Sequence, residues 1–232
     1  SDTLPKSINV LNPMSGLYTQ LRTSLRQSLL ATLQQNQFYS EGPFKLFELG
    51  RVFYPSDEGL PNENERITGI CTGQKSPNHW NLHPEDISFY DTKGILEQVF
   101  AGLNINVEYS LGSDGSYETN QSATISYLGT VIGTIGRVKK SVLQNFDIQL
   151  EPVFMFDIEL SKILSANPPA NNKFEQISRF PEAIRDLALI VDDTTNSSDI
   201  TAQILKQPYV TAVDIFDVYS GDELDPGKKS LG

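Results

Sequence analysis

The sequence predicts an α+β protein made of an antiparallel sheet flanked by helices, followed by a smaller β-α-β unit. Three observations support this fold class. Leucines recur at every fourth position from Leu17 to Leu33, which is the spacing of an amphipathic helix. Short runs rich in aromatic and β-branched residues predict strands through the middle of the chain. A stretch with two prolines then precedes a final pattern of strand, helix and strand. We place the larger module at 1–166, the linker at 167–177 and the smaller unit at 178–232.

The first element expected is one helix, or a pair of short ones, over Leu17 to Leu33. Its leucine face should pack on the sheet, while Arg22 and Arg26 stay on the polar side. An aromatic-rich, mostly buried strand is expected next at Phe44 to Tyr54. Together these elements predict a helix packed on a strand at the start of the module.

The rest of the larger module follows the same alternation of patterns. A polar loop is expected at 58–65. Strands are expected at 66–73, 107–111, 123–127, 130–138 and 153–158. Helices are expected at 91–103 and 140–146. Leu128-Gly129 should form a tight hairpin. In the smaller unit we expect strands at 187–191 and 211–219 around a helix that Ser197 or Ser198 caps.

The composition argues against several classes of protein. Of 232 residues, 38% are hydrophobic, and 18 Lys and Arg stand against 29 Asp and Glu for a net charge of −11. This acidic balance argues against a surface that holds nucleic acid through its phosphates alone. The single cysteine excludes an internal disulfide framework, and no apolar run is long enough for a membrane span. Because the first residues lack an initiator Met and an apolar signal core, we expect a piece of a longer cytosolic protein.

Few residues suggest catalysis or metal binding. His79 and His83 stand four apart, a spacing that would suit zinc on a helix. However, Pro84 follows directly and no third ligand is evident, so we expect solvated loop histidines. Cys71 lies in an expected strand, which predicts a buried, unreactive thiol.

The glycines and carboxylates provide no stronger signal. Gly129 to Lys140 contains three glycines, but their spacing fits neither a dinucleotide fingerprint nor a P-loop, so it predicts a closely packed strand. Carboxylates that flank strands of the smaller unit should be solvated, with a divalent metal site as the less favoured alternative: Asp186, Asp192, Asp193, Asp214 and Asp217. From the residues alone we predict no catalytic, cofactor-binding or metal-binding residue.

Several segments resemble one family, in order and over nearly the whole chain. Leu11–Ser15 with Leu21–Leu25, and then LFELGRVF at Leu46–Phe53, resemble the start of the last large module of the bacterial phenylalanyl-tRNA synthetase beta subunit. FYDTKG at Phe89–Gly94 resembles its helix-opening motif. The segments that resemble the first half of its ferredoxin-fold anticodon-binding domain are Arg179–Pro181, Arg185–Ala188, Phe216–Tyr219 and Gly227–Leu231.

The resemblance implies that a different subunit of the enzyme carries out catalysis. The enzyme would hold two alpha and two beta chains, and its alpha subunit would join phenylalanine to tRNA(Phe) with ATP and Mg. This module would have the fold of a class II synthetase core but be catalytically silent, with no cofactor in this chain. In an active core, an arginine after a strand like Gly50–Phe53 clamps the ATP α-phosphate. Here Tyr54 and Pro55 follow, and no glycine-rich arginine segment lies between Val153 and the linker.

Two arginines and one departure from the family need interpretation. Arg22 and Arg51 are either a relic of a nucleotide site or partners of carboxylates such as Glu48 that order the packing of helix and strand. We favour the second interpretation. The chain also has Tyr117–Ala123 where a His-Pro-Gly-Arg loop is typical of the family, which removes any contact made by that arginine.

These observations predict a non-catalytic, cytoplasmic structural module of phenylalanine-tRNA ligase that docks the alpha subunit and supports tRNA binding. The alternative is an autonomous ATP-dependent ligase or transferase of class II type, which Tyr54 and the missing arginine segment disfavour. A standalone RNA-binding protein is a third hypothesis, which the net charge disfavours.

Overall fold

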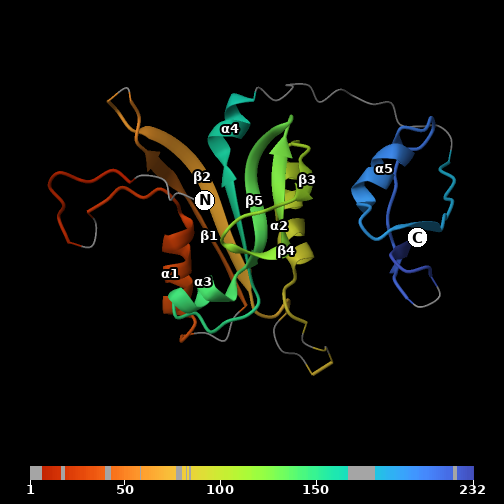
Figure 1. Cartoon of the computed structure of the whole chain (residues 1–232), viewed down its shortest axis with the longest axis horizontal. Helices are drawn as coiled ribbons and strands as arrows, with labels where there is room; N and C mark the ends of the chain where they lie inside the picture. Colours follow the sequence, from red (N-terminus) through yellow and green to blue (C-terminus); the bar gives the residue numbers. More distant parts are fainter. Residues whose placement is uncertain are drawn as a thin grey trace. The chain divides into compact units, whose positions relative to one another are not determined.

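A computed structural model describes residues 7–16, 19–39, 43–57, 59–76, 80–81, 83, 85–166, 181–221 and 224–232. The chain divides into two compact units, Ser1–Asn171 and Asn172–Gly232, each with a sheet of its own (Figure 1). The expected linker at 167–177 lies outside the described residues. Within the described ranges, no helix has the length and apolar character needed to cross a membrane.

The larger unit is an antiparallel sheet of six strands with helices packed on both faces, as the sequence predicts (Figure 1). The order across the sheet is β1-β2-β6-β5-β4-β3, so β1 and β3 are the edges. The strands are β1 (Phe44–Tyr54), β2 (Asn62–Thr72), β3 (Glu108–Leu111), β4 (Tyr117–Tyr127), β5 (Thr130–Val138) and β6 (Val153–Glu159). The helices are α1 (Arg26–Asn36), α2 (Phe89–Gly102), α3 (Lys140–Asn145) and α4 (Leu160–Ser165).

Strand β6 divides the core between the two faces of the sheet, because successive side chains of a strand point in opposite directions. Val153 and Met155 join a cluster with α1 and α3. Phe156 and Ile158 join a second cluster with α2 and α4. By the same alternation Asp157 lies on the face that α1 covers. Among the described residues it is the only charged side chain in the buried class, at 3% exposure.

Helix α1 begins at Arg26, later than the leucine spacing predicted. The segment before it is extended, because Leu21 donates its backbone N–H to the carbonyl of Ile8 and Val10 donates to Thr19. Leu17 lies outside the described residues. The predicted packing of the helix is confirmed, since Leu29, Leu30 and Leu33 lie in one cluster with Phe44 and Ile70 of the sheet. The predicted position of Arg26 is wrong: its guanidinium turns inward and meets Asp157.

Helix α2 begins at Phe89, two residues before the expected start at Asp91 and at the first residue of the motif that resembles a helix opening. The Ser88 side chain accepts a hydrogen bond from the Asp91 N–H, and the Asp91 carboxylate accepts one from the Ser88 N–H at 2.7 Å. This reciprocal capping box satisfies two backbone donors that a helix otherwise leaves unpaired. The motif that resembles a helix opening therefore does open a helix.

The β1–β2 hairpin differs from its prediction in two respects. Strand β1 is not mostly buried: it is an edge strand, and Phe47 and Leu49 are 71% and 62% exposed on one of its faces. Strand β2 also begins inside the expected loop, because the pairing continues to Tyr54 opposite Asn62. The hairpin is thus longer and more exposed than the aromatic pattern predicts.

The β4–β5 hairpin follows its prediction more closely. Leu128 and Gly129 both have positive φ, 49° and 74°, as a tight turn between strands requires. Close packing along β5 is confirmed at Gly136, where a Cβ would lie 2.6 Å from the ring of Tyr117. Tyr117 itself is buried at the start of β4, so the segment that replaces the expected loop begins as a strand.

The smaller unit is a three-stranded sheet with one helix. Its elements are β7 (Leu189–Asp192), α5 (Ser197–Leu205), β8 (Val218–Tyr219) and β9 (Lys228–Leu231). The order is β7-β9-β8, and β9 is antiparallel to both neighbours, so β7 and β8 are parallel across it. This split β-α-β arrangement is typical of ferredoxin-like folds. The strand expected at 211–219 shortens to Val218–Tyr219, because only these two residues pair with β9. Neither expected serine caps α5, since Asn196 is its N-cap residue.

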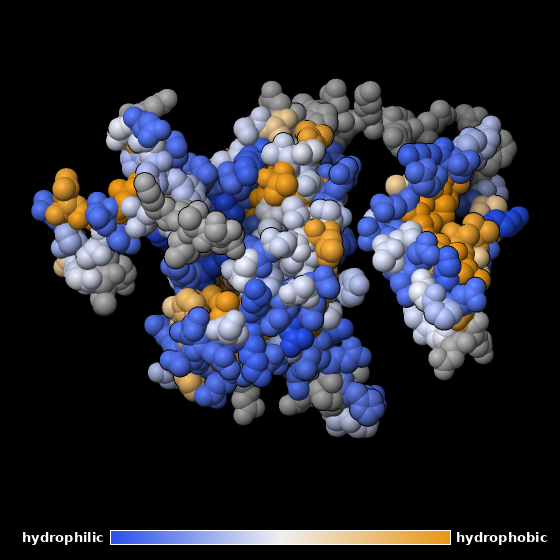
Figure 2. Space-filling view, viewed as in Figure 1, coloured by the Kyte–Doolittle hydropathy of each residue, from blue (hydrophilic) through white to orange (hydrophobic). Residues whose placement is uncertain are grey.

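The smaller unit leaves much of its apolar surface uncovered. Its helix α5 has no buried residue, and hydrophobic side chains gather along one visible face of the unit (Figure 2). Its exposed large hydrophobic residues are Ile184, Leu187, Ile190, Leu205, Tyr209, Phe216, Val218 and Tyr219. Among the described residues of the unit, Leu231 is the only hydrophobic side chain in the buried class.

The packing of α1 predicts the stability of the larger unit. Replacing the fully buried Leu33 by alanine should lower the free energy of unfolding by about 2–5 kcal/mol, because the side chain leaves a cavity between helix and sheet. Urea denaturation followed by circular dichroism measures the change. Gln35→Ala, at an exposed position of the same helix, is the matched control and should change stability by less than about 0.5 kcal/mol. Equal effects of the two changes would show that this face of α1 is not the core face.

Candidate functional site

The strongest candidate site is a buried ionic cluster centred on Asp157 of β6. One carboxylate oxygen accepts from Nε of Arg26 at 2.8 Å, and the other accepts from Nε of Arg66 at 2.8 Å. The second oxygen also accepts from the Thr68 hydroxyl at 3.1 Å. The Asp157 side chain is only 4% exposed, while those of the two arginines are 18% and 15% exposed. One carboxylate thus joins α1 to two adjacent strands.

Other donors of both arginines also have carboxylate or hydroxyl partners. Arg26 donates from Nη1 to Asp114 at 2.8 Å and from Nη2 to the Thr134 hydroxyl at 2.9 Å. Its guanidinium also lies 5.2 Å from the centre of the Tyr117 ring, a cation–π distance. Arg66 donates from Nη1 to Glu159 at 3.2 Å. Two guanidinium groups therefore meet three carboxylates, and each charge that would be costly to bury alone has an opposite charge beside it.

The surroundings in the cluster shift the pKa values of Arg26, Asp114 and Tyr117. Burial alone would lower the pKa of Arg26, but Tyr117, Asp157 and Asp114 together raise it above its ordinary value. Burial raises the pKa of Tyr117 to about 12, against the opposing effect of Arg26. Burial would also raise the pKa of Asp114, but Arg26 and hydrogen bonds from Ser116 outweigh it and hold this pKa below 3.8. Arg26 and Asp114 are therefore held in their charged forms.

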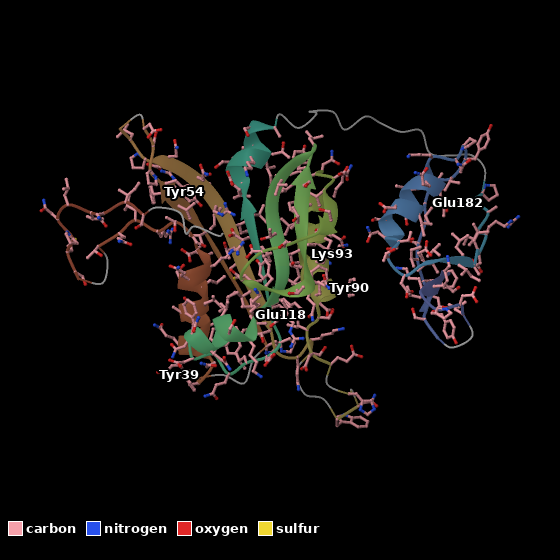
Figure 3. The ribbon with its side chains drawn as sticks, in the orientation of Figure 1. Tyr39, Tyr54, Tyr90, Lys93, Glu118 and Glu182 are labelled. Atoms are coloured by element: carbon pink, nitrogen blue, oxygen red, sulfur yellow. The ribbon has the colours of Figure 1, made fainter. Side chains whose placement is uncertain are left out.

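A hollow of about 340 Å³ lies beside the cluster. Its wall includes Arg26, Arg66 and Asp157, together with Tyr54 at the end of β1 (Figure 3). The Tyr54 hydroxyl donates to the backbone carbonyl of Thr23 at 2.9 Å, and burial raises the pKa of Tyr54. The other lining residues are Thr23, Ser24, Gln27, Leu30, Ser116, Val142, Phe146 and Met155.

The arginines singled out in the sequence pair with carboxylates, as predicted. Arg22 donates to Glu48 and also, at 2.8 Å, to the backbone carbonyl of Arg51, which links the segment before α1 to β1. Arg51 lies 3.0 Å from Glu63 and 3.6 Å from Glu65 across the hairpin. Its pairing therefore orders two strands rather than a helix and a strand. Its side chain is 60% exposed, so the contribution to stability is small.

The other candidates are not brought together. His83 is exposed, and His79 lies outside the described residues. Cys71 is buried in β2, where burial raises the pKa of its thiol. The five aspartates singled out in the smaller unit are all exposed, and Asp192 pairs with Lys228 at 2.6 Å. Among the residues that the structure describes, no group of three His, Cys, Asp or Glu side chains could hold a metal ion.

The central residues of this cluster were not predicted from the sequence. One signal was available: Asp157 interrupts the apolar run VFMFDIE, and a carboxylate in a buried strand requires a partner. No pattern in the sequence indicates which cations meet it. Arg26 and Asp157 lie 131 residues apart, and only the sheet brings them together.

Loss of one cation should destabilise the larger unit. Arg26→Met keeps the aliphatic stem but leaves Asp157 and Asp114 without their shared partner, so we expect a loss of about 3 kcal/mol in the free energy of unfolding. The matched control is Arg51→Met, which removes an exposed pair and should cost at most about 1 kcal/mol. Urea unfolding of the three chains measures both changes. Similar losses would mean that the cluster is no more than a surface ion pair.

The pKa of Asp114 predicts a dependence of stability on pH. Because its pKa is lower in the folded state, its contribution is fully present above the unfolded pKa near 3.8 and is lost as pH falls through the lower folded value. The stability difference between wild type and Asp114→Asn should thus be constant near about pH 6 and shrink below about pH 4. Urea unfolding of both chains across this range measures it. A difference that grows on acidification would reverse the assigned direction of the shift.

Comparisons with known proteins match both units. Residues 1–160 match the family described as the phenylalanyl tRNA synthetase beta chain CLM domain, and residues 178–232 match the ferredoxin-fold anticodon binding domain. A phenylalanine–tRNA ligase beta subunit from Dehalococcoides mccartyi is 32% identical over 227 residues, which covers 98% of this chain and 28% of the relative. The beta subunit from Syntrophotalea carbinolica is 34% identical over 238 residues, covering 99% of this chain and 29% of the relative.

A third relative supports the same assignment. The beta subunit from Staphylococcus epidermidis is 34% identical over 228 residues, and these cover 97% of this chain. The chain spans only 28% of that relative's length, as it does for the relative from Dehalococcoides mccartyi. The ordered match of both units shows that the chain belongs to the phenylalanyl-tRNA synthetase beta chain family, with the CLM domain at residues 1–160 and the anticodon-binding match at 178–232.

Proposed function

We propose that this chain is a non-catalytic structural module of a phenylalanine–tRNA ligase, which docks the alpha subunit and supports tRNA binding during aminoacylation of tRNA(Phe). The observation that carries the proposal is the match of both units, in order, to beta-subunit relatives over nearly the whole chain. The proposed domains are a core-like module at 1–166, a linker at 167–177 and the first part of an anticodon-binding domain at 178–232.

The larger unit would have the fold of a class II synthetase core. In support, its sheet is antiparallel throughout and has helices packed on both faces. The strand that resembles the family signature is β1, and its hairpin with β2 lies at one edge of the sheet.

The ionic cluster supports the absence of catalysis. Tyr54 occupies the position where the resemblance places the arginine that would clamp ATP, and its hydroxyl is bonded to the backbone of Thr23. Arg26 and Arg66 do line the hollow, but each already binds carboxylates of the chain itself. Charge that develops on a phosphate needs cations whose donors are available. The residues of the hollow therefore do not fit the phosphates of a nucleotide, and ATP and Mg would act in the whole enzyme, outside this chain.

The proposed partners are the alpha subunit, in an assembly of two alpha and two beta chains, and tRNA(Phe). The proposed compartment is the cytoplasm. The smaller unit alone is a poor site for tRNA, because ten acidic residues stand against five basic ones over 178–232. Its role in tRNA binding would therefore depend on the rest of the enzyme.

Two measurements test the proposal. The chain mixed with the alpha subunit from the same organism should elute earlier from a sizing column than either chain alone, with both chains in the peak. The chain alone should show no exchange of pyrophosphate into ATP with phenylalanine, because its cations are internally paired. Absence of a complex would overturn the docking role. Exchange clearly above a buffer blank, and lost in Arg66→Gln, would instead favour an autonomous class II ligase.

A further inference from the structure

The hollow contains groups that normally recognise anions. A guanidinium is a planar donor that matches a carboxylate or phosphate, and Arg26 and Arg66 bring two of them to one wall of a space of about 340 Å³. That volume lies at the lower end of the range of small-molecule sites, roughly 300–1,000 Å³. Tyr54, Thr23 and Ser24 add polar groups to the same wall. Groups of this kind hold a phosphate only where their donors are not already taken by other acceptors.

The carboxylate of Asp157 already lies where such a ligand would bind. One of its oxygens meets Arg26 at 2.8 Å and the other meets Arg66 at 2.8 Å, so it bridges the two guanidinium groups as a bound anion would. The Thr68 hydroxyl adds a third donor at 3.1 Å. We propose that Asp157 is an internal substitute for an anionic ligand and keeps the hollow closed to phosphate-bearing molecules.

Charge and donor geometry both support this closure. Asp114 and Glu159 take further donors of the two arginines, at 2.8 and 3.2 Å, so three carboxylates face two guanidinium groups. Glu159 also pairs with Lys162 at 3.2 Å, so an external phosphate would add negative charge to a cluster in which each carboxylate already has its cation. Repulsion between like charges about 4 Å apart is strong at the dielectric of a partly buried site. Asp157 also lies on a central strand that is paired on both sides, and both of its carboxylate oxygens already accept hydrogen bonds.

The inference rests on the proposed function in one respect, since it supplies the physical reason why the module is not catalytic. It concerns only this chain, however, and its test needs neither the alpha subunit nor tRNA. A failure to dock the alpha subunit would therefore leave the inference standing, and a failure of the inference would leave docking untouched.

The test is a titration of the chain with inorganic pyrophosphate in which calorimetry measures binding. Wild type should show no saturable binding at millimolar concentrations. Asp157→Asn keeps the size of the side chain but removes its charge, so this variant should bind pyrophosphate at least about tenfold more tightly. Asp157→Asn combined with Arg66→Gln should lose the gain. The matched control is Glu63→Gln, which makes the same change of charge beside the exposed Arg51 and should stay at the wild-type level.

Three results of the calorimetric titration would overturn the inference. These are wild-type binding as tight as that of Asp157→Asn, no gain in a folded Asp157→Asn chain, and an equal gain in Glu63→Gln. If Asp157→Asn is unfolded or marginal, its folded fraction is measured by circular dichroism as pyrophosphate is added. Binding to the folded state alone must then raise that fraction, whereas wild type should not respond. A folded fraction that does not rise with pyrophosphate would also overturn the inference.

Discussion

The larger unit depends on one buried interaction, the bridge that Asp157 makes between Arg26 and Arg66. The aspartate lies on a central strand of the sheet, one arginine comes from the helix above it, and the other comes from the neighbouring strand. A lone carboxylate at this depth would be costly, and so would two lone guanidinium groups. Each group is therefore tolerated only because the others are in place, and the cluster defines how α1 sits on the sheet.

A buried ionic cluster contributes less to net stability than its short distances suggest. Desolvation offsets most of the attraction, and apolar side chains of similar volume often stabilise a core as well or better. Its distinctive effect is on geometry, since a guanidinium accepts few arrangements of its partners. The leucines of α1 bury the helix, but leucines pack in several ways, whereas Arg26 must meet Asp157, Asp114 and Thr134 together. The apolar contacts hold the helix against the sheet. The ion pairs of Arg26 set which part of the helix lies over which part of the sheet.

The same cluster connects the fold to the proposed function. Members of the beta chain family share this module, and here its cations are consumed by carboxylates of the chain. The smaller unit differs, because it exposes large hydrophobic side chains along one visible face (Figure 2).

Sequence patterns within a single element were reliable. The segment Phe89–Gly94 marked the opening of α2, and Leu128-Gly129 marked a hairpin, because neighbouring residues settle both features. The ordered motifs also indicated the family. Patterns that depend on distant partners were not reliable. The leucine spacing predicted a helix from Leu17, but α1 begins only at Arg26. The reason is that backbone hydrogen bonds to residues 8–10 hold residues 19–21 extended.

The candidate site was the least accessible to sequence reasoning. By itself the sequence determined the α+β class, most of the strands and helices, and the family, since these follow from local periodicity and ordered motifs. The tertiary structure alone decided that β1 is an exposed edge and that Arg26 turns inward to a carboxylate 131 residues away. The physical reason is that burial and charge pairing belong to the assembled sheet. An arginine on a helix faces solvent or core according to what the opposite strand presents.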